Sequence, residues 1–349
     1  MVSSVFDTGS VHAVRRPVFE VSFGSGSPDD WGQNVASVTV QAGLTPSVGV
    51  VEVYLDGGDQ APATAVGDSG SVSFGYEDGI AELIFTGQVE EVCQDVRGGT
   101  RVTASDGGAV LSTQRINQSY EQQKAGDIVS DLAGRAGVGT DTVEDGVEFP
   151  FYVVDDRRSA YRHIAALARR SGYLAYFTPE NKLNFAPFAS SQPVQTFSYG
   201  EVIISLRTTK IAAVVGAVTT VGEGAAGSQG QEAWSWLVKD PSSVTSSAGS
   251  DGAERQIQDA SLRSADAARS AAEGIANATD RTGLTGELLV PGSPAVVVGS
   301  VVEIVDAPQD ALNGLYLVTG VRHRFSKAKG FTSLARLAKT DGGGLGRLL

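Results

Sequence analysis

The sequence is poor in the residues from which disulfides and metal centres are built. Its 349 residues include one cysteine, Cys93, so no disulfide can form within the chain. The three histidines, His12, His163 and His323, are far apart in sequence. Because zinc and calcium sites need clustered ligands at fixed spacing, we expect neither a metal nor another cofactor. Scarce cysteine is typical of a protein that assembles in a reducing compartment.

Long apolar runs and an excess of basic residues are also missing. No apolar stretch approaches the roughly 20 residues that a membrane helix needs. The first residues lack the basic segment and apolar run of a signal peptide, so we expect assembly in the cytoplasm and no membrane segment. With 27 Lys and Arg against 40 Asp and Glu, the net charge is −13. This balance argues against sequence-specific binding of nucleic acid.

The charge is unevenly distributed along the chain. Residues 1–115 carry 5 basic and 15 acidic side chains, whereas residues 281–349 carry 8 basic and 5 acidic ones. An acidic end and a basic end suit head-to-tail contacts between copies of the chain.

The pattern of apolar residues divides the chain into three parts. Short alternating runs separated by Gly, Asp and Pro turns fill residues 11–115 and predict an antiparallel barrel or sandwich. Residues 116–190 contain two helical patterns and a hairpin around Pro179–Lys182. From residue 191 the β pattern returns, interrupted at about 253–279 by an alanine-rich helix with Ile257 and Ala260 on its apolar face.

This order predicts an α+β chain that is mostly β. We expect an N-terminal β-barrel at residues 1–115 and a small α/β insert at 116–190 (helix, helix, β-hairpin). A C-terminal β-barrel at 191–349 would contain the alanine-rich helix. The fold is thus two β-barrel domains bridged by the insert.

Two features raise the alternative of a hydrolase. Gly67-Asp68-Ser69-Gly70 is similar to the nucleophile segment of chymotrypsin-type proteases, but that site needs a histidine base and a buried aspartate. We interpret it as a hairpin turn. The acid pairs Glu90-Glu91 and Asp155-Asp156 would suit paired catalytic carboxylates. In a chain with 40 acidic residues, solvated faces or helix caps are the simpler interpretation.

Two further features raise the alternative of a binding module. Spaced glycines at 222–227 fit a dinucleotide-binding pattern, but a strand-like segment follows where that motif needs a helix. We interpret these glycines as a flexible hairpin tip. In that segment, exposed Trp234 and Trp236 would suit a carbohydrate-binding β protein.

His323 lies in the run NGLYLVTGVRHRF, which opens with an Asn-Gly turn. Strand alternation places Leu315, Leu317, Thr319, Val321, His323 and Phe325 on one face, and Tyr316, Val318, Gly320, Arg322 and Arg324 on the other. His323 is thus on the more apolar face and has no catalytic partner nearby, which favours a structural role. His163 lies on a helix beside several arginines, and we expect it at the surface.

The last segment resembles a known family. In GELLVPGSPAVVVGSVVEIVDAPQDALNGLYLVTGVRHRFSKAKGFTSLARL (286–337), the resemblance is carried by ten positions: Gly286, Gly292, Pro294, Gly299, Gly314, Tyr316, Val318, His323, Phe331 and Thr332. This pattern is similar to the C-terminal barrel of phage tail hub proteins, including the late control protein D family and the hub half of VgrG spikes. The two helices and the hairpin of 116–190 resemble the middle of the same family.

The resemblance implies a structural baseplate hub and no enzyme. Family members look like two related barrels plus an insert, with three copies forming a pseudo-six-fold ring between a hexameric tail tube and a trimeric spike. It implies a homotrimer whose partners are the tube protein, the spike protein and other baseplate proteins of a phage tail or contractile injection system. The spike is expected to be a separate polypeptide, and the acidic balance is expected to give the ring a negative channel.

Within the terminal barrel, the resemblance and the strand pattern together select five residues with expected structural roles. Asn313 and Gly314 form the turn, and Tyr316, His323 and Phe331 belong to the barrel wall. We expect no catalytic, cofactor or metal residue.

Overall fold

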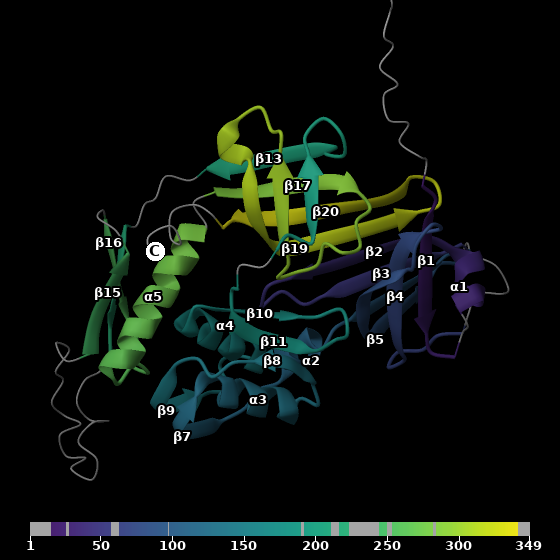
Figure 1. Cartoon of the computed structure of the whole chain (residues 1–349). Coiled ribbons are helices and arrows are strands. Elements are labelled where there is room, and N and C mark those ends of the chain that lie inside the picture. The colour runs from purple at the N-terminus through teal and green to yellow at the C-terminus, as the bar shows by residue number, and fades with distance from the viewer. Residues whose placement is uncertain are drawn as a thin grey trace, which may run out of the picture.

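The computed structural model describes residues 15–25, 28–56, 63–96, 98–189, 192–210, 216–222, 244–249, 253–281 and 284–340. Strands dominate, and the chain is α+β and mostly β, as the sequence pattern predicted. Among the described residues, twelve strands form one large sheet. The three small sheets and helices α2 to α5 lie below it and at its left in Figure 1, whereas α1 lies at the other end, beside β1.

Six strands of the large sheet come from the N-terminal part of the chain. They are β1 (Pro17–Phe23), β2 (Val35–Gly43), β3 (Val50–Leu55), β4 (Ser69–Tyr76), β5 (Glu82–Gln94) and β6 (Thr100–Ser105), with α1 (Pro28–Asn34) between β1 and β2. Their order in the sheet is β1-β4-β5-β6-β3-β2. Alternate residues of each strand point inward, so one face of this half encloses an apolar core that includes Trp31 of α1.

The other six strands come from the C-terminal part. They are β12 (Gln195–Ser198), β13 (Ser205–Lys210), β17 (Leu284–Pro291), β18 (Val301–Val305), β19 (Gly314–Ser326) and β20 (Gly330–Lys339), with the 3-10 helix η3 (Asp310–Leu312) before β19. The sheet continues from β2 into β19-β20-β17-β13, and β18 and β12 branch from β19. The N-terminal and C-terminal parts thus contribute six strands each to one continuous sheet.

The insert lies below the junction of the two halves (Figure 1). The short helix α2 (Gly108–Thr113) precedes it. The insert comprises β7 (Gln118–Lys124), α3 (Ala125–Arg135), β8 (Thr140–Val143), β9 (Glu148–Val154), α4 (Ala160–Ser171), β10 (Tyr173–Phe177) and β11 (Leu183–Pro187). The helices lie where the apolar spacing places them. The Ser159 hydroxyl caps α4 by accepting from the backbone N–H of Arg162, and Gly172 ends it with a φ of 69°.

The alanine-rich helix differs from its prediction. α5 spans Ala265–Arg281 instead of beginning near residue 253, and β16 (Glu254–Gln258) precedes it. β16 pairs in parallel with β14 (Ala217–Val221), so Ile257 is on a strand. Ser264 then begins the helix by accepting from the backbone N–H of Ala267. The strand was missed because the spacing of Ile257 and Ala260 continues the apolar stripe of the helix toward the N-terminus.

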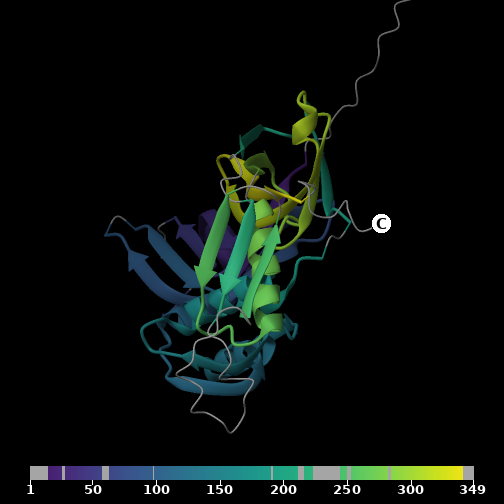
Figure 2. The same ribbon diagram turned by 90° about the vertical axis from the view of Figure 1, so that its left-hand side faces the viewer.

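α5 and its strands form an outlying unit. β14, β15 (Thr245–Gly249) and β16 make a separate three-stranded sheet instead of joining the large one, and α5 lies along it (Figure 2). α5 packs against α4 at Gly274, where a Cβ would lie 2.6 Å from the backbone nitrogen of Gly172. Arg170 Nε lies 2.6 Å from Asp259 Oδ2, and this largely buried ion pair fixes the same contact.

The contact between Gly172 and Gly274 gives a testable prediction. Gly274→Ala adds a methyl group where only backbone is in reach, so we expect a loss of about 1–3 kcal/mol in the free energy of unfolding. This is the net change: the steric cost outweighs the gain of about 1 kcal/mol that replacing glycine with alanine normally brings to a helix interior. Urea unfolding followed by far-UV circular dichroism measures the difference.

Gly134→Ala in α3 is the matched control, because a Cβ there meets no atom within 4 Å. It should stabilise the protein by up to about 1 kcal/mol. If both variants change stability in the same direction, the close approach of the two helices is not what limits residue 274.

Candidate functional site

The junction between the sheet halves buries His323 of β19. Its side chain is 1% exposed. Nε2 lies 3.0 Å from the Val296 carbonyl oxygen, which can only accept, so Nε2 carries the proton. Nδ1 then accepts from the Ser333 hydroxyl at 2.8 Å, and Ser333 Oγ accepts from the backbone N–H of Ser293. This chain of hydrogen bonds joins β19, β20 and the segment after β17 through a neutral imidazole.

Burial lowers the pKa of His323 to about 4, and the bond to Val296 only partly opposes this. The unfolded chain has the ordinary pKa of 6.5 and therefore binds a proton first as the pH falls. Stability contributed by the neutral imidazole is complete above pH 6.5 and is lost as the pH falls toward 4.

Phe331 of β20 packs beside His323 and extends into the N-terminal core. Its ring centroid lies 6.0 Å from that of His323 and 4.8 Å from that of Phe74 in β4. Gly292 faces the Phe331 ring so closely that a Cβ would lie 1.9 Å from it, and its carbonyl accepts from Tyr76. The C-terminal hairpin thus completes the core of the other half.

Asn313, Gly314 and Tyr316 hold the loop between β18 and β19. The Asn313 side chain accepts from the backbone N–H of Ala307 and donates to its carbonyl. Gly314 has a φ of 127°, a conformation that side chains disfavour. The Tyr316 hydroxyl donates to the Leu312 carbonyl, and its ring is fully buried. These contacts place the three residues in a loop anchor away from His323.

The predicted division of β19 into two faces holds only beyond residue 320. Tyr316 and Val318 were placed opposite Val321 and His323, yet Tyr316, Val318 and Val321 share one core. The register with β20 shifts between Val318 and Gly320, which is a β-bulge. The extra residue, Thr319, reverses the alternation, so residues of both parities point inward.

Sequence reasoning missed Asp106, which lies after β6. Its carboxylate accepts from the backbone N–H groups of Gly49 and Gly108, and burial raises its pKa to about 7. Stability from the protonated form is therefore lost as the pH rises through 7, opposite in sign to His323. Asp106 and His323 both line a cavity of about 20 Å³ at which all three parts of the chain meet. Ser-Asp-Gly-Gly resembles an ordinary turn, so the sequence contained no strong indication.

His163 was expected at the surface, and the structure corrects this. It is 3% exposed, donates from Nε2 to the Asp155 carbonyl at 3.1 Å and accepts at Nδ1 from the Tyr152 hydroxyl at 3.4 Å. Burial lowers its pKa. Spacing within α4 predicts this position, since residue 163 lies one turn from the buried Ala160 and Leu167.

The residues that suggested a hydrolase take part in strand pairing, a turn and surface ion pairs. Ser69 is the exposed first residue of β4 and pairs with Gln88 of β5. Asp68 accepts from the backbone N–H of Ala65, as a turn residue does. In the acid pairs, Glu91 bonds to Arg101 and Asp155 to Arg157.

Several other sequence features lie wholly or partly outside the described residues. His12, Trp234, Trp236 and all but the first of the glycine-rich residues 222–227 are not described. Over the part of the chain that is described, no three His, Cys, Asp or Glu residues come together as metal ligands. Among the described helices, none has both the length and the apolar character to span a bilayer.

The pKa of His323 gives a testable prediction. The difference in unfolding free energy between the native chain and His323→Gln should be largest above pH 7. It should shrink between pH 6.5 and 4 by at most about 1.4 kcal/mol per pH unit, because only the native chain has this titration. Urea unfolding at a series of pH values measures it. Contributions of Asp106 and His163 cancel in the difference, so a constant difference would contradict the buried neutral imidazole.

Solved tail proteins have a similar fold. A prophage MuSo2 43 kDa tail protein from Shewanella oneidensis matches with a TM-score of 0.69 at 13% identity, over 93% of this chain and 99% of that one. A tail protein from Neisseria meningitidis MC58 matches with 0.69 at 12%, over 94% and 99%. A type VI secretion component of E. coli, described as similar in structure to the T4 tail proteins gp27 and gp5, matches with 0.60 at 11%, over 92% and 76%. Identities this low show a shared fold alone.

The family is shown by a match of another kind. No curated protein sequence matches this chain. The family model described as phage tail baseplate hub (GPD) matches residues 45–329, from the residues before β3 to the turn between β19 and β20. The matched range contains Gly314, Tyr316, Val318 and His323, on which part of the sequence resemblance depended. Because the match covers well over half of its length, the chain belongs to the phage tail baseplate hub family.

Proposed function

We propose that the chain is a structural hub at the tip of a tail tube and assembles as a homotrimeric ring of pseudo-six-fold symmetry. The observation that carries this proposal is the division of the large sheet into two halves of six strands. Three such chains contribute six sheet units, which suits contact with a hexameric tube on one side. The same ring retains exact three-fold symmetry for a trimeric spike on the other.

Force transmission is the mechanical part of this proposal. β2 and β19 join the halves through a continuous antiparallel ladder, and the Phe325 and Phe331 rings from the C-terminal hairpin lie in the N-terminal core. Such a joint couples the two halves rigidly, because separating them breaks backbone hydrogen bonds and exposes aromatic rings together. The tube protein, the spike protein and other baseplate proteins are the partners that we propose.

We further propose that the hub performs no catalysis. The described histidines, His163 and His323, both use their two ring nitrogens in internal hydrogen bonds. Ser69 belongs to a strand pair, and the family is one of structural tail proteins. Incorporation into the baseplate of the particle completes the proposal.

The mass of the purified full chain tests the ring. We expect multi-angle light scattering to show a species of three times 36.1 kDa, and electron-microscopy class averages to show a ring with six similar lobes. Raising the salt concentration should weaken the ring if the acidic N-terminal and basic C-terminal parts meet between copies. A chain that stays monomeric at all concentrations, and also when mixed with its tube and spike proteins, would contradict the proposal.

A further inference from the structure

The β19–β20 hairpin has an unusual charge for this acidic chain. Between residues 311 and 340 there are six basic residues and no acidic one, in a protein with a net charge of −13. The six are Arg322, Arg324, Lys327, Lys329, Arg336 and Lys339. A basic segment of this kind in an acidic protein raises the question of which anion it meets.

Strand register collects the arginines on one face of the large sheet. His323 and Phe325 point into the cores, so Arg322 and Arg324 point to the opposite, exposed face. Gly320, which shares that face, pairs with Arg336 of β20.

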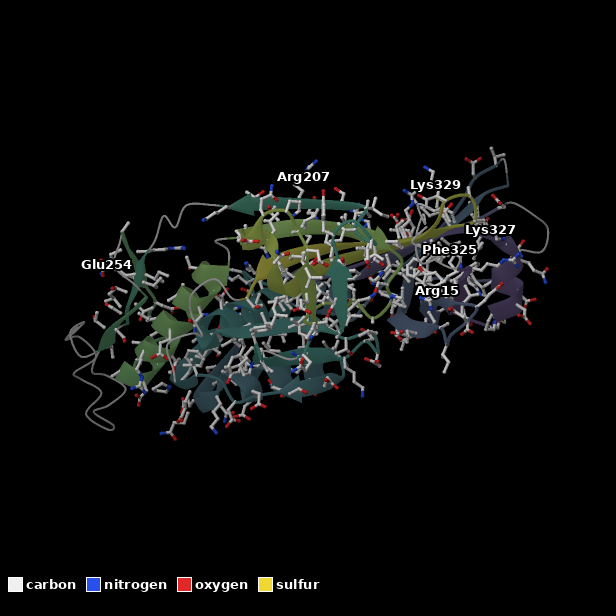
Figure 3. The ribbon with its side chains drawn as sticks, turned by 45° about the horizontal axis from the view of Figure 1, so that its top comes forward. Arg15, Arg207, Glu254, Phe325, Lys327 and Lys329 are labelled. Carbon is white, nitrogen blue, oxygen red and sulfur yellow. The ribbon has the colours of Figure 1, made fainter. Side chains whose placement is uncertain are left out.

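The same register adds a fourth arginine from the edge of the sheet. Arg336 is opposite Glu287 of β17, and Glu287 is opposite Arg207 of β13. We call Arg207, Arg322, Arg324 and Arg336 the arginine face. In Figure 3, Arg207 marks one end of this region and Lys327 and Lys329 mark the hairpin turn toward the other.

Nearby carboxylates neutralise this face only in small part. The strand register places Glu287 between Arg207 and Arg336, and it places Glu52 of β3 on the same face, two strands from Arg324. The ion pairs found between described residues include none from the hairpin. Arg322 donates to the neutral Gln41 side chain, and Lys327 donates to a backbone carbonyl. The N-terminal half of the same face differs, because Arg101 there pairs with Glu91.

The surface around the arginines is hollowed, and the walls of the hollows combine charged, polar and apolar residues. Two adjoining hollows of about 500 and 360 Å³ share Glu287, Thr319 and Arg336 in their walls. The smaller hollow is also lined by Arg207, Thr209 and Thr285. The larger one is also lined by Arg322 and by apolar residues that include Leu44, Val48, Val50 and Leu334. Nucleic-acid interfaces are much more positively charged than protein–protein interfaces. The excess of arginine over carboxylate on this face therefore favours a phosphate-bearing polymer.

We propose that the arginine face binds the phosphodiester backbone of a nucleic acid without reading its sequence. Guanidinium groups match the geometry of phosphate oxygens, and four of them on rigid strands suit successive phosphates. Base reading requires an element that enters a groove, and the face is an open stretch of sheet. This site goes beyond the proposed hub function and does not require a ring. The face is thus locally positive in a chain whose net charge is −13.

Binding of a labelled DNA duplex tests the proposal. Fluorescence anisotropy of a 30-base-pair duplex with the purified full chain should show weak binding at low salt, equal for two unrelated sequences. Four phosphate contacts predict a slope of about −3.6 in a plot of log K against log salt concentration. The double variant Arg322→Gln/Arg336→Gln should bring the slope to about −1.8, since each lost contact removes about one unit.

The matched control is Arg162→Gln/Arg169→Gln on the exposed side of α4, which changes the net charge equally. It should leave the slope unchanged. The proposal fails if the control weakens binding as much as the test variant, or if no binding occurs at 25 mM salt. It also fails if polyglutamate displaces the duplex as well as unlabelled DNA does, since the face would then recognise acidic protein. If the native chain forms the trimer but does not bind DNA, this inference is rejected and the proposed hub function is not affected.

Discussion

The pairing of β2 with β19 is the constraint on which the rest of the structure depends. Seven residue pairs, from Gly43 with Gly320 to Ser37 with Ser326, join segments about 280 residues apart in sequence. Ordering so distant a contact has a large entropic cost, which local preference cannot offset. The pairing is stabilised by burial of apolar surface, because the β19–β20 hairpin places Phe325 and Phe331 in the core of the N-terminal half.

The polar groups at this joint explain its specificity. A buried histidine with two partners costs less than an unpaired one, and the bonds of His323 to Ser333 and Val296 satisfy both ring nitrogens. Asp106 satisfies backbone donors of Gly49 and Gly108 at the same cavity. Their pKa shifts have opposite sign with respect to stability, so over acidic pH the loss at His323 is partly offset by the gain at Asp106.

Local patterns in the sequence predicted the class of fold, the helices α3 and α4, and an inward-facing His323. These predictions succeed because the spacing of apolar residues and the capping of helices depend only on residues close together in the sequence. The partner of β2 could not be predicted, since any alternating strand satisfies the same rule. The start of α5 was misplaced because Ile257 fits both periods, and the bulge at Thr319 was missed because one inserted residue leaves no compositional trace. Asp106 acquires its role only when Gly49 approaches from another strand.

The arginine face follows from the same alternation that buries His323. In β19, one residue in two must leave the core, and the residues between the inward-pointing Val321, His323 and Phe325 are arginines. A shift of one residue in register would bury the arginines and expose the aromatic and imidazole rings, so the charges help to fix the register itself. The register requires only that these positions be polar, and glutamate, threonine or glutamine would satisfy it equally. The consistent choice of basic residues over thirty positions of an acidic chain is therefore unexplained by folding, and points to an anion outside the protein.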